Sequence, residues 1–321
     1  MSVLNRSHFY DEKAAFAYVE SILWPNGPVC PHCGGLERAY RLEGVRTKPN
    51  AEQREKGLPG HERHGLWKCG HCRKQFTVRK NTIFEESHCP LHKWLQAIHL
   101  MASSKKGISA HQMHRVLEVQ YKTAWFLEHR IREAMRSGTL RPFGGGGGDV
   151  EADETFIGRE PGKPKKRAYH HKMKVLSLVD RDSGQARSVV VDDLKPSTIL
   201  PILYENIAQE ARILTDEGGH YKTLGYDFAG HKIVRHGAGE YVSADDRSVH
   251  TNTIEGYFSI FKRGMKGVYQ HCAKKHLHRY LAEFDFRYNH RIANGYNDSQ
   301  RAQRVLASVV GKRLTYRDSL G

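Results

Sequence analysis

Two closely spaced pairs of cysteines impose the strongest local constraint on how this chain can fold. Cys30 and Cys33 form the first pair, and Cys69 and Cys72 form the second. Each pair can turn its backbone around a metal ion, and four thiolates together complete a tetrahedral zinc shell. Such a shell leaves no position for water, so we expect a structural zinc ion. The alternative is two chance pairs of reduced thiols.

A charged stretch of sequence separates the two cysteine pairs. Residues 44–65 carry many charges and two prolines but almost no apolar side chains, so they have little surface to bury. We predict an exposed insertion that could remain disordered. A short amphipathic helix over residues 9–24 is predicted before the first cysteine pair.

Apolar residues recur with helical spacing between residues 91 and 136. This pattern predicts three helices with a short turn before the third, as in a helix-turn-helix unit. Five consecutive glycines, Gly144–Gly148, then predict a linker, because such a run cannot occupy a regular element cheaply. The expected regions are a helix and zinc ribbon over 1–84, the helical region over 85–141, the linker over 142–148 and a second domain over 149–321.

Alternating apolar residues beyond the linker predict strands. The expected strands are 150–157, 174–180, 186–191, 212–216 and 232–236, and the expected helices are 197–211, 253–263 and 274–289. Three strands, a helix, two further short strands and then helices follow the order of an RNase H-like domain. We therefore predict an α/β fold, with a mixed sheet and flanking helices.

The charge balance points to a polyanionic partner. The chain has 51 lysines and arginines against 35 aspartates and glutamates, a formal net charge of +16, which favours nucleic acid. No run of about 18 apolar residues is present, so we expect no membrane span. The first residues lack the apolar segment of a secretory signal, and we expect a cytoplasmic protein.

Two aspartates lie on predicted strands beyond the glycine run. Asp153 lies within the first of these strands, and Asp216 ends a short apolar strand. Carboxylates in such positions are natural ligands for a hard divalent cation such as Mg²⁺. The alternative is that both are ordinary strand-end or turn residues.

A third carboxylate lies on the predicted helix around residues 250–263. At about 100° per residue, Asn252, Glu255 and Lys262 share a polar arc beside the apolar packing face. Gly256 within this helix would suit a close approach of the helix to the sheet. A solvated polar face with incidental charge is the alternative interpretation.

Taken in order, these motifs resemble those of bacterial insertion-sequence transposases of the DDE type that carry an N-terminal zinc ribbon. The resemblance covers nearly the whole chain, although the insertion and the glycine run depart from the family pattern. The matching motifs are Trp24-Pro25-Asn26-Gly27 with Cys30-Pro31-His32-Cys33-Gly34, Trp67-Lys68-Cys69 through Cys72, Asp153-Glu154-Thr155-Phe156-Ile157-Gly158, Thr215-Asp216, and His250-Thr251-Asn252-Thr253-Ile254-Glu255-Gly256 with Lys262.

The resemblance implies phosphoryl transfer on DNA. It implies that Asp153, Asp216 and Glu255 hold two Mg²⁺ or Mn²⁺ ions, as in other two-metal sites. Asn252 is the alternative third residue, or a group that orients a ligand or contacts DNA. We favour Glu255 because Lys262 lies seven residues beyond it, as the family pattern implies. Lys262 would then pair with a phosphate near the cut.

The partner implied by the resemblance is double-stranded DNA, both transposon ends and target, bound by a homo-oligomer. A basic loop after Asp153 would contact phosphates, and the third helix of the helix-turn-helix unit would read the end sequence. The candidate residues are Lys165, Lys166 and Arg167 in the loop, and Lys122 and Arg130 in the helix. The loop could alternatively be simply solvated.

Two competing functions remain open at this stage. The first is a nuclease of the same fold that cuts DNA without joining strands. The second is a DNA-binding regulator, in which the ribbon and the helices bind DNA and the C-terminal domain is a scaffold without catalytic activity. The three intact carboxylates argue against the regulator, and only a strand-transfer assay separates the nuclease from the transposase.

Overall fold

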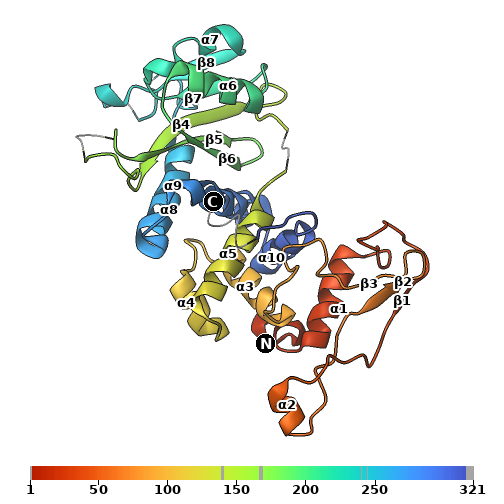
Figure 1. Ribbon diagram of the computed structural model, residues 1–321. Helices are drawn as coiled ribbons and strands as arrows, with labels where there is room; N and C mark the ends of the chain where they lie inside the picture. The colour runs from red at the N-terminus through yellow and green to blue at the C-terminus, as the bar shows by residue number, and fades with distance from the viewer. Residues whose placement is uncertain (1, 139–140, 166–168, 240, 244, 316–321) are drawn as a thin grey trace. The chain divides into compact units, whose positions relative to one another are not determined.

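The computed structural model describes residues 2–138, 141–165, 169–239, 241–243 and 245–315 (Figure 1). The chain divides into two compact units. Unit 1 comprises Met1–Ser103, Ala110–Ala134 and Asp298–Gly321, and unit 2 comprises Ser104–Ser109 and Met135–Asn297. Among the described residues, no helix is both long and apolar enough to cross a membrane.

Unit 1 begins with short helices and a small antiparallel sheet of order β1-β2-β3 (Figure 1). These elements are η1 (Val3–Asn5), η2 (Ser7–Phe9), α1 (Glu12–Leu23), β1 (Ala39–Arg41), β2 (Trp67–Cys69) and β3 (Gln75–Phe76). The side chain of Asp11 accepts a hydrogen bond from the N–H of Ala14 at 3.1 Å and caps α1. Pro25 disfavours helical backbone at Trp24, where α1 ends.

The insertion over residues 44–65 is exposed, but it is folded. Its two arms run antiparallel and pair at Arg46 and Glu62. The tip holds the short helix α2 (Ala51–Glu55), which begins with a capping box at Asn50. Local hydrogen bonds order the segment although no residue of α2 is buried. The sequence-based expectation considered burial alone and therefore allowed disorder.

The three helices expected between residues 91 and 136 are present in unit 1. They are α3 (Leu91–Ser103), α4 (Ala110–Leu117) and α5 (Tyr121–Met135). Glu118, with φ 51°, reverses the chain between α4 and α5. A further helix near the end of the chain, α10 (Asp298–Ala307), packs against α3 and α1. The segment from Asp298 thus belongs to unit 1, whereas the sequence suggested one domain over 149–321.

Unit 2 is built on a five-stranded sheet of order β6-β5-β4-β7-β8 (Figure 1). The strands are β4 (Asp149–Ile157), β5 (Met173–Asp180), β6 (Gln185–Val191), β7 (Arg212–Thr215) and β8 (Gly230–Ile233). The first three strands are antiparallel, and β7 and β8 add in parallel beside β4. Each strand overlaps a predicted one, and the order is that of an RNase H-like fold.

Helices cover both faces of this sheet. The helices and turns are α6 (Pro196–Asn206), η3 (Gly219–Tyr221), α7 (Leu224–Asp227), η4 (His236–Ala238), α8 (Asn252–Gly264), the π-helical η5 (Met265–Tyr269), α9 (Lys274–Asn289) and η6 (Ile292–Asn294). Val150 and Ala152 pack in one core with α6. Ile157 packs in the other with α8 and α9. Because side chains alternate along β4, Glu151 and Asp153 belong to the face covered by α8 and α9.

The glycine run ahead of β4 is folded into unit 2. Phe143, immediately before the run, is buried in the core of this unit. Gly144 has φ 72°, and its N–H donates to Asp180 Oδ2 at 3.3 Å. The boundary between the two units lies at Ala134–Met135, ahead of the segment 142–148 that was predicted as the linker.

Candidate active site

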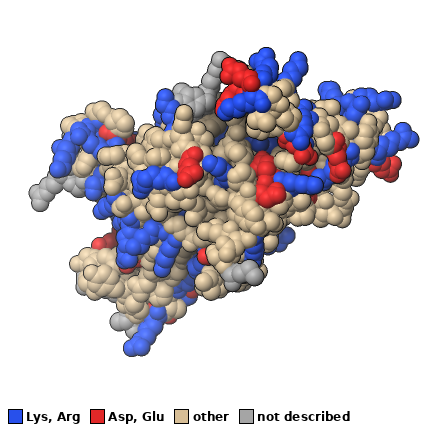
Figure 2. All heavy atoms as spheres, turned by 90° about the horizontal axis from the view of Figure 1, so that it is seen from below, with Lys and Arg blue, Asp and Glu red and all other residues tan. Residues whose placement is uncertain are grey.

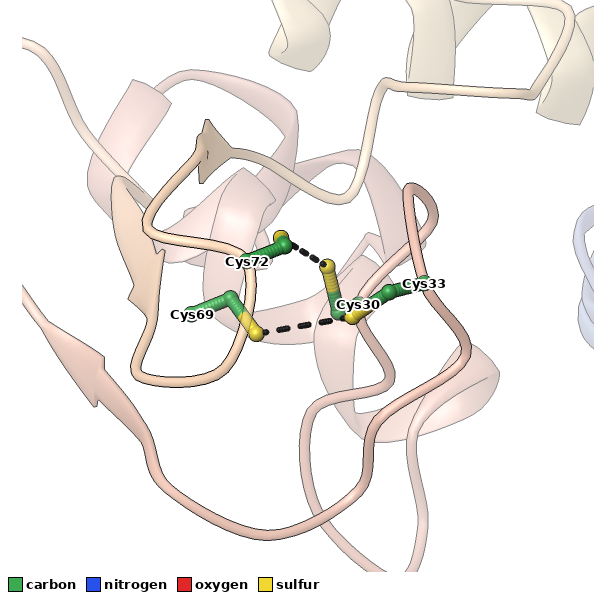
Figure 3. Close-up of side chains that lie close together, drawn as sticks. All are labelled: Cys30, Cys33, Cys69 and Cys72. Carbon is green, nitrogen blue, oxygen red and sulfur yellow. Dashed lines mark hydrogen bonds between the residues drawn. The ribbon is translucent and has the colours of Figure 1, made fainter.

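The four paired cysteines converge in unit 1 (Figure 3). The Sγ atoms of Cys30 and Cys72 are 3.7 Å apart, as are those of Cys33 and Cys69. All four sulfurs lie within 4.8 Å of one another. A tetrahedral zinc ion with Zn–S bonds of about 2.3 Å separates its sulfurs by about 3.8 Å. The cysteines therefore have the geometry of a closed zinc shell, as expected for a structural ion.

Asp153 and Asp216 lie at the same level on neighbouring parallel strands of unit 2. The register pairs Asp149 with Arg212 and Glu151 with Leu214. Continuing this register along β4 brings Asp153 level with Asp216, which directly follows β7. The two carboxylates are thus placed by backbone pairing alone.

The backbone around Asp216 holds its side chain in place. The N–H of Gly218 donates to Asp216 Oδ1 at 2.9 Å. A Cβ atom at Gly218 would lie 2.9 Å from the same oxygen. Glycine at this position therefore allows the carboxylate to turn back onto its own loop.

Negative charge accumulates around Asp153. Burial, followed by the charges of Glu154 and Asp216, raises the pKa of Asp153 to about 8, and Glu255 adds to the effect. A divalent cation would reverse this shift, because it favours the ionised carboxylates. Carboxylate oxygens are also the ligands that Mg²⁺ prefers. The donor set therefore fits a hard divalent cation.

A buried glutamate anchors the helix that bears Glu255. Glu151 is 0% exposed, and its Oε2 accepts a hydrogen bond from the N–H of Ile254 at 2.8 Å, in the first turn of α8. Its Oε1 accepts from Arg181 Nε at 2.7 Å. These bonds fix the start of α8 over the sheet face that carries Asp153.

Glu255 and Asn252 both lie in the first turn of α8 and are both exposed. The charge of Glu255 contributes to the raised pKa of Asp153. Among the described residues, only the cysteines bring three or more ligand atoms within 4.8 Å of one another. Asp153, Asp216 and Glu255 therefore form a more open group than the zinc shell.

Sequence reasoning missed the role of Glu154. Its Oε1 accepts hydrogen bonds from His220 Nε2 at 2.9 Å and from the hydroxyl of Tyr221. Burial lowers the pKa of His220, but the carboxylates of Glu154, Asp216 and Asp153 raise it above its ordinary value. Glu154 thus ties β4 to the turn that follows Asp216. The signal available in the sequence was an acid beside Asp153 on the opposite sheet face.

Lys262 lies near Asp153 and Glu255, and Lys266 and Lys172 lie near Lys262. Burial lowers the pKa of Lys262, and the charges of Lys266 and Lys172 lower it further, although Asp153 opposes them. None of the three lysines forms an ion pair with another described residue. Their positive charge therefore remains available to a phosphate.

Of the two residues of α5 that were predicted to contact DNA, Arg130 is buried and Lys122 is exposed. Arg130 is 5% exposed, and its guanidinium donates to the carbonyl oxygens of Leu314, Ile83 and Glu85 at 2.9, 2.8 and 2.8 Å. It lies on the core side of α5, so it cannot reach DNA. Lys122, in the first turn of α5, is exposed.

The remaining candidates lie in the basic loop after β4. Lys165 is exposed. Lys166 and Arg167 lie outside the described residues. Lys and Arg side chains are prominent on the face of the molecule drawn in Figure 2, in keeping with the formal net charge of +16.

Comparison with known proteins identifies two domains. Residues 146–289 match the ISXO2-like transposase domain, and residues 10–75 match the transposase zinc-ribbon domain. No curated protein matches the chain. One similar solved structure is the simian T-cell lymphotropic virus intasome in complex with PP2A regulatory subunit B56 gamma. It is 11% identical with a TM-score of 0.28, and the match covers 60% of this chain and 65% of that chain.

Proposed function

We propose that this chain, which its matched domains make an ISXO2-like DDE transposase with an N-terminal zinc ribbon, cuts DNA at transposon ends and joins them to target DNA. A DDE transposase domain is that of a phosphoryl-transfer enzyme. One observation carries the proposal. The β4–β7 register, extended by two residues, brings Asp153 level with Asp216, and burial together with nearby charges, those of Asp216 and Glu255 among them, raises the pKa of Asp153 to about 8.

The three acids have a defined role in this mechanism. Asp153, Asp216 and Glu255 would hold two Mg²⁺ or Mn²⁺ ions, which stabilise the attacking and leaving oxygens of an in-line displacement. Water loses a proton and attacks a phosphorus at the transposon end, and the bond to O3′ breaks. The released 3′-OH then attacks a target phosphodiester and displaces its O3′. Positioning and charge neutralisation suffice, so no covalent enzyme intermediate is needed.

DNA binding would divide between the two units. Lys262, Lys172 and Lys266 would neutralise phosphates near the reacting bond, and the basic loop with Lys165, Lys166 and Arg167 would extend that contact. In unit 1, Lys122 would contribute to reading the end sequence. Acting on two transposon ends favours a homo-oligomer on DNA.

The test is a cleavage and strand-transfer assay on the native flanking DNA ends with Mg²⁺ or Mn²⁺. Wild type is compared with Asp153→Ala, Glu255→Ala and Asn252→Ala. We expect joined products from wild type and none from Asp153→Ala or Glu255→Ala. Activity that survives in Glu255→Ala but is lost in Asn252→Ala would make Asn252 the third residue of the site.

The same assay separates the competing functions. Metal-dependent cleavage without joined products would favour a nuclease. Specific binding of the DNA ends without any chemistry in the wild type would favour a regulator.

A further inference from the structure

His236 lies beside the helix that carries the third proposed acid. It begins η4, in the connection between β8 and α8. His236 Nε2 is 3.2 Å from the hydroxyl oxygen of Thr251 and 3.6 Å from Glu255 Oε1. The Thr251 hydroxyl oxygen can accept a hydrogen bond from this ring nitrogen. A small rotation of the Glu255 side chain would bring its carboxylate within hydrogen-bond distance of the same nitrogen.

The surroundings of the other ring nitrogen, Nδ1, indicate which nitrogen of His236 carries a proton. Nδ1 is buried and has no hydrogen-bond partner among the described residues. A proton on this buried nitrogen would lack an acceptor, which is costly. A proton on Nε2 has Thr251 and Glu255 as its neighbours. With the proton there, the ring directs its N–H toward these two side chains.

The segment that carries His236 is also tied to the loop of the second acid. The N–H of Gly237 donates to Glu217 Oε1 at 2.9 Å, and Glu217 directly follows Asp216. A Cβ atom at Gly237 would lie 2.6 Å from the same oxygen, so glycine permits this close approach. A continuous set of contacts therefore runs from the loop of Asp216 through His236 to Glu255.

We propose that His236 is a positioning residue, which holds the Glu255 carboxylate toward Asp216 and so sets the geometry of the divalent-cation site. The inference rests on the proposed function and deepens it. It also favours Glu255 over Asn252 as the third acid, because it is Glu255 that lies within reach of the His236 N–H.

The test measures Mn²⁺ binding to the full-length, zinc-loaded protein by isothermal titration calorimetry. It also measures the Mn²⁺ concentration that gives half-maximal cleavage. His236→Phe keeps an aromatic ring against Tyr241, whose ring centroid is 5.4 Å away, but removes the donor. His236→Gln keeps an N–H at a similar reach, whereas His236→Asn is polar but too short. Tyr241→Phe is the control, since it removes only a hydroxyl group from a largely exposed ring.

We expect Mn²⁺ binding about 10- to 100-fold weaker in His236→Phe and His236→Asn. We expect most of the loss to be recovered in His236→Gln and no change in Tyr241→Phe. A merely structural role would lower thermal stability in both polar variants alike, and would not follow the reach of the donor. Wild-type Mn²⁺ affinity in His236→Phe and His236→Asn would overturn the inference, as would a Gln variant no better than Asn.

The same experiment can reject the proposed function independently of the role of His236. Asp153→Asn is titrated beside the His236 variants. If it binds Mn²⁺ as tightly as wild type, Asp153 holds no ion, and both the two-metal site and the role of His236 are overturned. If Asp153→Asn loses binding and His236→Phe does not, only the role of His236 is overturned.

Discussion

At the scale of single residues, the clearest requirement concerns Gly218. Its φ of −57° suits any residue, so Gly218→Ala introduces no backbone strain. The new Cβ would lie 2.9 Å from Asp216 Oδ1, 3.0 Å from His220 Cε1 and 3.2 Å from Tyr221 Cδ2, so the carboxylate and the two neighbouring rings would have to shift. Since a displacement of about 1 Å can cost about 100-fold in rate, we expect kcat for cleavage to fall by about that factor. Thermal unfolding of the variant, measured beside the assay, separates this local displacement from a loss of the folded state.

Gly219→Ala is the matched control, because a Cβ there meets no atom within 4 Å. Wild-type kcat in Gly218→Ala would contradict the role of Asp216 as a metal ligand. An equal loss in both variants would point to the flexibility of the turn instead.

The proposed acids of the site follow from the sequence residue by residue, whereas the contacts around them do not. Asp153 and Asp216 stand out because one lies within an apolar strand and the other directly follows one. Glu154 and His236 depend on partners far along the chain, which periodicity does not reveal. Arg130 was misassigned because the spacing of apolar residues in α5 did not indicate how far around that helix the core extends.

At the scale of elements, the attachment of α8 to the sheet depends on Glu151. In Glu151→Ala, the N–H of Ile254 and the guanidinium of Arg181 would lose a buried acceptor. Removing one partner of a buried charge pair costs about 3–5 kcal/mol, and we expect the free energy of unfolding to fall by about that amount. Urea denaturation of the full chain measures it.

Glu151→Gln tests the same contact with a side chain of similar size that has no charge. The amide oxygen can still accept from the N–H of Ile254, whereas the ion pair with Arg181 is lost. We expect a smaller destabilisation than in Glu151→Ala. Equal losses in the two variants would mean that the contact with α8 contributes little.

A second buried acid joins α8 and α9 to β6. Asp285 Oδ1 accepts hydrogen bonds from the hydroxyls of Tyr257 and Ser188 at 2.5 and 2.8 Å. Burial outweighs these bonds and raises the pKa of Asp285 to about 6. In the unfolded chain an aspartate ionises near pH 3.9, or roughly pH 4. Between about pH 4 and pH 6 the folded state therefore keeps a proton that the unfolded state releases.

The sign of this linkage makes a prediction. Stability from Asp285 is fully present below about pH 4 and is lost as the pH rises through about 6. Asp285→Asn removes the titrating group, so its stability should decline less than that of wild type across this window. The difference should be at most about 3 kcal/mol. Urea denaturation at several pH values tests it, and parallel profiles would contradict the assignment.

Regular elements were predictable where one physical rule dominates. The strands of unit 2 follow from alternating apolar residues, and their order follows from the sequence of elements. The sequence did not reveal the order of the exposed insertion over 44–65, because its capping box and paired arms depend on local hydrogen bonds and not on burial. The packing of α10 against α1 and α3 joins segments far apart in the sequence, so no local pattern predicts it.

At the scale of the whole molecule, the four-cysteine cluster lies in unit 1, and we expect zinc to stabilise the ribbon there and not unit 2. The sheet of the ribbon has strands of two or three residues, too few to fold without the metal. In Cys30→Ser with Cys69→Ser we expect zinc to be lost, by elemental analysis, and the ribbon to become sensitive to protease. Unit 2 should stay resistant. Full zinc retention would contradict the four-cysteine site.

The charge of the molecule yields the last prediction, which concerns DNA affinity. Binding that releases counterions weakens linearly with the logarithm of salt concentration, by a slope of about 0.9 for each phosphate neutralised. Lys266 lies near Lys262 and Lys172 and forms no ion pair with another described residue. Lys266→Gln should therefore lower the magnitude of this slope by about 1 and weaken binding to all DNA sequences equally, because phosphates carry no sequence information.

Lys195→Gln provides the comparison for this measurement. Lys195 precedes α6, which packs on the other face of the sheet, and it pairs with Asp193 at 3.7 Å. Its substitution should leave the slope unchanged. An unchanged slope in Lys266→Gln, or an equal change in both variants, would place the DNA away from the face that carries Asp153. The phosphate contacts and the metal site would then lie on different surfaces, which in-line attack on a bound strand does not allow.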